Sequence, residues 1–248
     1  MAAVVLGTPF FDVMICLFAA VAALELYEIL RPHGPLGRGY TVVLVAVALV
    51  FCAYHASHIY LALICVVCLA LTFAALQAIR NDRIRWKQNV IYPLCGAMYV
   101  GLPLATLILI RNLPDGLLWL IALTFTVWAT DTMALFGGRL FGKRKLAPQI
   151  SPSKTVEGAL TGILFGIGFG TSIMVAGGTS LAVALVLGVA GSVMAVLGDL
   201  LESLLKRVFR VKDASGLLPG HGGMLDRLDS FIAVAPVFYI LVLLLSTG

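Results

Sequence analysis

The chain has 248 residues, of which 61% are hydrophobic and 12% charged, and its formal net charge is +5. Ordinary soluble domains carry roughly 25% charged residues, so the composition excludes a soluble globular domain. We expect an all-α fold, a polytopic bundle of membrane-spanning helices, because a helix satisfies its own backbone hydrogen bonds within lipid.

Apolar runs divide the chain into about eight predicted transmembrane helices. A spanning helix needs about 20 predominantly apolar residues, and most of the runs reach that length. The predicted spans are 9–30, 41–57, 58–77, 89–110, 117–136, 155–177, 180–199 and 230–247. Residues 1–110 form a largely apolar scaffold, and residues 111–248 carry nearly all of the candidate chemistry. Within the scaffold, Glu25 and Glu28 are expected to pair with the Arg31 region.

The basic residues indicate how the helices are oriented. Sixteen of the seventeen Lys and Arg residues fall in alternate loops between the predicted spans, and only Arg111 lies in the others. Loops rich in Lys and Arg face the cytoplasm, so we expect both termini on the opposite side. The net positive charge is then explained by topology and a phosphate-facing surface, and nucleic acid is not expected as a partner.

A candidate phosphate-binding segment begins at the end of the fifth predicted span. Serine and threonine suit the start of a helix, and lysine supplies a positive charge for phosphate oxygens. The alternative interpretation, that the basic residues of loop 142–158 only set the topology, is accepted for Arg144. The segment that suits a polyphosphate is 151–155, with Ser151, Lys154 and Thr155, and Asp131 at the end of the fifth span faces the same boundary.

Glycine recurs every fourth residue in the sixth predicted span, at Gly158, Gly162, Gly166 and Gly170. This spacing places all four on one helix face, where another helix can approach closely. Glycine offers no chemistry, so the pattern predicts packing. The partner helix belongs either to the same chain or to a second copy, which makes a homodimer one expected arrangement.

Polar residues follow the seventh predicted span at helical spacing. Asp199, Glu202, Ser203 and Lys206 are placed at i, i+3, i+4 and i+7, so a continuing helix would carry all four on one face. An amphipathic helix end with a Glu202–Lys206 pair would explain two of them. It does not explain Asp199, an acid within an apolar run, which predicts a metal or phosphate site.

A glycine-rich turn, 219–223, opens onto the last predicted span. The backbone N–H groups of His221, Gly222 and Gly223 are placed to approach an anion at the helix start. Asp226 and Asp229 follow one turn apart. Carboxylates from the ends of two helices can bridge divalent cations.

Together these segments resemble the phosphatidate cytidylyltransferase family of integral membrane CDP-diacylglycerol synthases. The resemblance is specific over 131–230 and rests on two blocks of residues. The first block is Asp131-Thr132, Gly138, Gly142-Lys143, Lys145-Leu146, Ser151-Pro152, Lys154-Thr155 and Glu157-Gly158. The second is Ser203, Lys206-Arg207, Lys212-Asp213, Ser215, Leu218-Pro219, His221-Gly222-Gly223, Asp226-Arg227 and Asp229.

The resemblance implies that CTP and phosphatidate react to give CDP-diacylglycerol and pyrophosphate, at the cytoplasmic boundary of a bacterial-type inner membrane. It implies a two-cation centre containing Mg²⁺, with Asp199 and Asp226 as the bridging ligands and Asp229 in support. The catalytic residues would be Asp199, Ser203, Lys206, Arg207, Asp226 and Asp229. The nucleotide would be held by Asp131, Lys143, Lys145, Ser151, Lys154, Thr155, His221, Gly222 and Gly223. For His221, hydrogen bonding to phosphate and stabilisation of the turn are equally consistent with the sequence.

Two other functions are less consistent with these residues. A CTP-dependent polyprenol or phytol kinase would need a general base for a hydroxyl group, and the complete second block argues against it. An ion-coupled transporter would use Asp131 and Asp199 within the membrane. The sequence shows no inverted repeat, and its charges gather at one boundary, which argues against transport.

Overall fold

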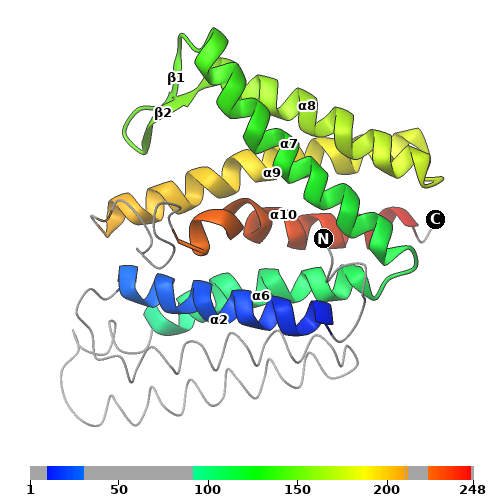
Figure 1. Ribbon diagram of the computed structural model, residues 1–248, viewed down its shortest axis with the longest axis horizontal. Coiled ribbons are helices and arrows are strands. Elements are labelled where there is room, and N and C mark those ends of the chain that lie inside the picture. The colour runs from blue at the N-terminus through cyan, green and yellow to red at the C-terminus, as the bar shows by residue number, and fades with distance from the viewer. Residues whose placement is uncertain (1–9, 31–91, 210, 212–222, 247–248) are drawn as a thin grey trace. The chain divides into compact units, whose positions relative to one another are not determined.

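The structure is a computed structural model that describes residues 10–30, 92–209, 211 and 223–246 (Figure 1). Its helices are α2 (Phe10–Leu30), α6 (Tyr92–Arg111), α7 (Gly116–Phe141), α8 (Val156–Ala176), α9 (Leu181–Val208) and α10 (Leu225–Ser246). All of these except α6 are long and apolar enough to cross a membrane. The prediction of an all-α polytopic membrane protein is confirmed, and the predicted spans 41–57 and 58–77 lie outside the described residues.

Three helices run further than their apolar segments. Helix α7 ends at Phe141 rather than 136, α9 continues to Val208 rather than 199, and α10 begins at Leu225 rather than 230. Hydropathy marks where charge begins, whereas a helix continues for as long as its backbone hydrogen bonds form. The predicted continuation beyond Asp199 is therefore confirmed.

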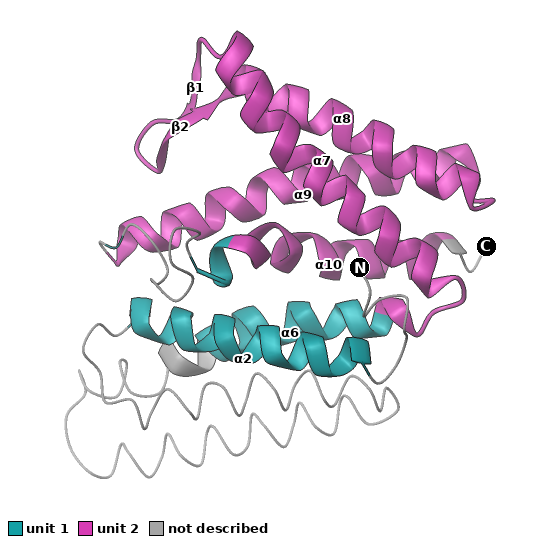
Figure 2. Ribbon diagram, viewed as in Figure 1, with its two compact units in different colours: residues 1–109, 211–226 teal, residues 110–210, 227–248 magenta. Residues whose placement is uncertain are grey.

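The chain divides into two compact units (Figure 2). Unit 1 comprises 1–109 and 211–226, and unit 2 comprises 110–210 and 227–248. In unit 1, a side chain at Gly96 of α6 would begin 3.2 Å from Leu30 Cδ1 and 3.3 Å from Leu26 Cδ2, so these helices pack closely there. The predicted division into 1–110 and 111–248 stays a prediction.

In unit 2, α8 packs against α7 through its glycine face. A Cβ atom at Gly158 would lie 2.6 Å from the Ala134 carbonyl oxygen. At Gly166 it would collide with the Thr130 hydroxyl, whose O–H donates to the Thr126 carbonyl at 2.7 Å. The predicted close approach is confirmed within the chain. The homodimer stays a prediction.

The segment between α7 and α8, which sequence analysis treats as a loop, is an antiparallel hairpin. Strand β1 (Lys145–Ala147) pairs with β2 (Ser151–Thr155). The turn is closed by the Ile150 N–H, which donates to the Ala147 carbonyl at 3.1 Å. Pro148 follows Ala147 and suits the second position of such a turn. Because the strands are short and polar, hydropathy alone gave no sign of them.

Candidate functional site

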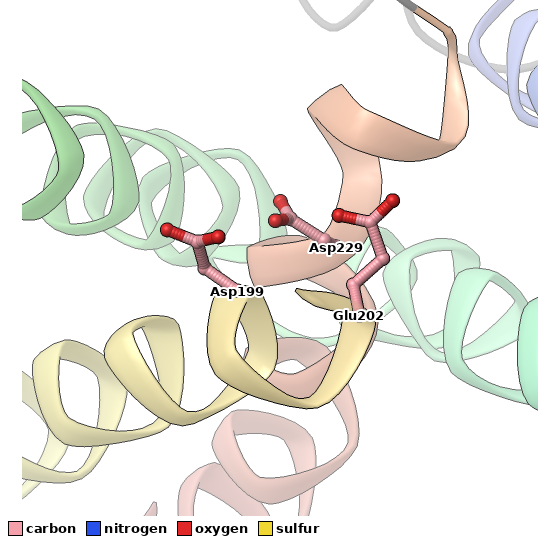
Figure 3. A group of neighbouring side chains, drawn as sticks. All are labelled: Asp199, Glu202 and Asp229. Carbon is pink, nitrogen blue, oxygen red and sulfur yellow. The ribbon is translucent and has the colours of Figure 1, made fainter. Parts of the chain in front are cut away.

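Three carboxylates gather where α9 approaches α10 (Figure 3). Asp199, Glu202 and Asp229 each contribute an oxygen, and these oxygens all lie within 4.8 Å of one another. Glu202 and Asp229 are buried, and Asp199 is partly exposed. Two oxygens bound to one hard cation at 2.0–2.6 Å are at most about 5 Å apart. The three carboxylates therefore suit one divalent cation, and we refer to them as the acidic group.

Two local features of the sequence bring these carboxylates together. Asp199 and Glu202 are three residues apart on α9, so they share a helix face. Gly198 lets α10 come close, because a Cβ atom there would lie 2.7 Å from both the Ala233 Cβ and the Asp229 carbonyl oxygen. The glycine that precedes Asp199 therefore makes room for the helix that carries Asp229.

Two lysines neutralise part of this negative charge. Lys154 Nζ, from β2, lies 2.6 Å from Asp199 Oδ2. Lys206 Nζ lies 3.2 Å from Glu202 Oε1, one helical turn earlier on α9. The pair expected from the i, i+4 spacing thus forms, yet Glu202 also belongs to the acidic group. The pairing and the cation site are compatible interpretations of the same residue.

Asp131 of α7 joins the acidic group through Ser230. The Ser230 hydroxyl oxygen lies 3.4 Å from Asp131 Oδ1 and 3.3 Å from the Ala195 carbonyl oxygen, so its proton can be donated to either. The backbone N–H of Ser230 donates to Asp229 Oδ1 at 2.6 Å. Ser230 therefore links a carboxylate of α7 with one of α10.

A cavity of about 460 Å³ opens beside the acidic group. Its polar lining combines positive and negative side chains, and its apolar lining comes from α7, α8, α9 and β1. The lining residues are Asp131, Ala134, Leu135, Gly138, Arg139, Leu146, Ser153, Lys154, Thr155, Ala159, Val196 and Asp199. A lining that combines carboxylates, cations and apolar side chains suits a ligand that carries both phosphate and hydrocarbon.

The hairpin is anchored at the start of α8. The Glu157 carboxylate accepts the backbone N–H groups of Lys143 at 3.0 Å and Arg144 at 3.1 Å. The Thr155 hydroxyl accepts the Gly158 N–H at 3.2 Å, which confirms the predicted helix cap. These contacts close the base of the hairpin and hold Lys154 beside Asp199.

Other predicted residues lie apart from the cavity lining. Lys143 and Lys145 are exposed, and Ser151 and Ser203 are half-buried. Arg207 Nε donates to the Ile150 carbonyl at 3.1 Å, so this side chain contacts the hairpin turn. The predicted phosphate and nucleotide roles of these five residues stay predictions.

The predicted anion-binding turn is described only at its end. His221 and Gly222 lie outside the described residues. The Gly223 N–H donates to Asp226 Oδ2 at 3.1 Å, in unit 1, so this amide is directed at a carboxylate. The predicted pairing of Asp226 with Asp199 on one cation stays a prediction.

Sequence reasoning left three contributors out of the site. Glu202 is not among the predicted metal ligands, although its spacing from Asp199 places both on one helix face. Arg139 was counted only as a topology signal, yet it lines the cavity. Glu157 was noted as part of a motif, but its contact with residues 13 and 14 positions earlier needs the hairpin.

The fold and the site define a class: an integral membrane protein in which three carboxylates suited to a cation lie beside a cavity lined by polar and apolar side chains. The chain belongs to the cytidylyltransferase family, which it matches over residues 1–245. The resemblance drawn from the two motif blocks is thereby confirmed.

Curated relatives give a narrower comparison. The chain is 43% identical over 153 residues to the phosphatidate cytidylyltransferase of Bacillus subtilis, 60% of this chain and 57% of that protein. It is 40% identical over 167 residues to that of Haemophilus influenzae, 62% of this chain and 58% of that protein. A Brucella abortus relative of the same name is 41% identical over 162 residues, covering 63% and 58%. The aligned part thus spans somewhat more than half the length of these relatives.

Proposed function

We propose that the protein transfers the cytidylyl group of CTP to phosphatidate, giving CDP-diacylglycerol and pyrophosphate. The observation that carries this proposal is the ion pair between Lys154 and Asp199 at the wall of the cavity. It brings together a member of the acidic group and Lys154, the lysine that we propose binds phosphate. The curated relatives named phosphatidate cytidylyltransferase support the same choice of substrates.

The reaction requires little proton transfer from the protein. A phosphate oxygen of phosphatidate forms a bond to the α-phosphorus of CTP, and the bond from that phosphorus to the bridging oxygen of the β-phosphate breaks. The phosphate monoester of phosphatidate is already ionised near neutral pH, so no strong general base is needed. Catalysis then depends on positioning and on neutralising the charge of the triphosphate.

The carboxylates suit Mg²⁺, which binds oxygen ligands and would offset the negative charge of the triphosphate. Asp199, Glu202 and Asp229 would hold it, and we retain Asp226 as a further ligand. Lys154 would bind the phosphates of CTP, in exchange for its contact with Asp199. The apolar residues of the cavity lining would admit the lipid tails of phosphatidate.

The site would face the cytoplasm, at the headgroup level of a bacterial-type plasma membrane. CTP arrives from the cytoplasm, whereas phosphatidate is held in the bilayer by its tails. The reacting groups therefore have to meet at that boundary. The bias of Lys and Arg toward one set of loops supports this orientation.

The test uses purified protein in lipid–detergent micelles with labelled CTP, phosphatidate and Mg²⁺. We expect CDP-diacylglycerol, no product with a polyprenol acceptor, and loss of turnover on chelation that Mg²⁺ reverses. Residues that only orient a metal ligand are worth about 10–100-fold, so Asp199→Asn and Asp229→Asn should each cost more than about 100-fold.

Asp115→Asn provides the matched control, because Asp115 is exposed in the turn between α6 and α7 and does not line the cavity. It should retain wild-type turnover. Phosphorylation of the polyprenol, or the absence of any nucleotide turnover by folded wild-type protein, would contradict the proposed function.

A further inference from the structure

Glu25 of α2 makes a contact that its sequence neighbours do not indicate. Its side chain is buried, with 1% of the residue exposed. Its Oε1 accepts the backbone N–H of Met224 at 3.0 Å, and its Oε2 accepts that of Leu225 at 2.7 Å. The expected pairing of Glu25 with the Arg31 region cannot be compared, because residue 31 lies outside the described part of the chain.

These two amides lie at the start of α10: Leu225 is its first residue and Met224 directly precedes it. The first N–H groups of a helix have no carbonyl partner within that helix, and a buried N–H without any acceptor is costly. A carboxylate at this end also interacts favourably with the helix dipole. Glu25 therefore caps α10 from 200 residues earlier in the chain. Two bonds from one carboxylate restrict the backbone at Met224 and Leu225, where the first turn of α10 begins, within unit 1.

That first turn carries Asp226. Its carboxylate is directed by a third bond, because its Oδ2 accepts the N–H of Gly223 at 3.1 Å. Gly223 directly precedes the amide that donates to Glu25 Oε1. The backbone of 223–226 is thus held by Glu25 on one side and by the Asp226 carboxylate on the other, within unit 1.

We propose that Glu25 is a positioning residue for Asp226, through which the predicted scaffold half of the chain sets the orientation of a cation ligand. The inference rests on the proposed function, in which Asp226 binds a divalent cation. A residue that served only to cap a helix would affect the exchange of the two amides and nothing else. A positioning residue would also affect cation affinity.

The variant is Glu25→Gln, which retains one acceptor oxygen but turns an NH₂ group toward the second amide. Glu28→Gln is the matched control, because it is the same substitution on an exposed residue of α2. Full-length protein in detergent would be measured without CTP or phosphatidate, by hydrogen–deuterium exchange of 223–226 and by Mn²⁺ titration with electron paramagnetic resonance. Glu25→Asp, whose shorter side chain withdraws both oxygens, serves if Glu25→Gln does not fold.

We expect Glu25→Gln to speed exchange of the Met224 and Leu225 amides about tenfold and to weaken Mn²⁺ binding several-fold, with Glu28→Gln unchanged in both. Faster amide exchange with unchanged Mn²⁺ affinity would show that Glu25 only caps the helix, and would overturn the proposal. Unchanged amide exchange in Glu25→Gln would overturn it as well. Neither readout uses turnover. Wild-type protein that binds Mn²⁺ but makes no CDP-diacylglycerol would contradict the proposed function alone.

Discussion

Removing the charge of Lys154 should strengthen cation binding to the substrate-free protein. Lys154 Nζ lies 2.6 Å from Asp199 Oδ2, so it competes with a divalent cation for that oxygen. The variant Lys154→Gln removes the competing charge but keeps a polar side chain of similar length. Lys154→Arg keeps the charge and serves as the control.

The exposure of the pair sets the size of the effect. The side chains of Lys154 and Asp199 are 22% and 38% exposed, so solvent screens much of their attraction. Partly exposed ion pairs are worth up to about 1 kcal/mol. A gain of that size corresponds to roughly fivefold tighter binding, since about 1.4 kcal/mol is tenfold. Mn²⁺ titration followed by electron paramagnetic resonance, without nucleotide, measures this directly.

The same substitution should weaken CTP binding, because a charge-assisted contact with phosphate is worth roughly 1.5–3 kcal/mol, or about ten- to a hundredfold. The two affinities should therefore move in opposite directions in Lys154→Gln. In Lys154→Arg, Mn²⁺ affinity should stay within about twofold of the wild type. If Lys154→Gln bound Mn²⁺ no more tightly than the wild type, Lys154 would not be the competing cation.

Two further predictions concern packing and the hairpin. Gly166→Ala should lower the thermal stability of the detergent-solubilised protein by about 1–3 kcal/mol, because its Cβ would collide with the Thr130 hydroxyl. Gly168→Ala should leave the stability unchanged, because nothing lies within 4 Å of its added carbon. Equal melting temperatures of the two variants would contradict the glycine-face packing. Arg207 donates to the Ile150 carbonyl, in the turn that the Ile150 N–H closes. Arg207→Gln should therefore loosen this turn and speed exchange of the Ile150 amide by up to about tenfold, at the low end for a charged donor because the contact is exposed. A change in CTP affinity with unaltered exchange would favour the phosphate-binding role instead.

Sequence reasoning succeeded where the relevant property is local. The four-residue glycine spacing of α8 fixes a helix face whatever packs on it, and that face meets α7 as expected. Asp199 and Glu202 share a face because α9 continues beyond its apolar segment. The Thr155 cap of α8 could also be predicted, because a helix cap involves residues only three apart in the chain.

Contacts between distant segments were decided by packing. The Lys154–Asp199 pair requires a hairpin that hydropathy did not reveal, and the contact of Glu25 with α10 joins residues 200 positions apart. The acidic group forms only because Gly198 admits α10 to within contact of α9.

By itself, the sequence determined the class of fold, the approximate spans of the described helices and the family, through apolar length, helical spacing and fixed motif spacing. Only the tertiary structure decided which carboxylates share one site, and that Lys154 lies against one of them. The physical reason is that hydrophobic burial is satisfied by any apolar neighbour, and helix formation depends on residues close in the chain. Neither property specifies which distant segments meet. The meeting of particular helix ends depends on where small residues allow two backbones to touch.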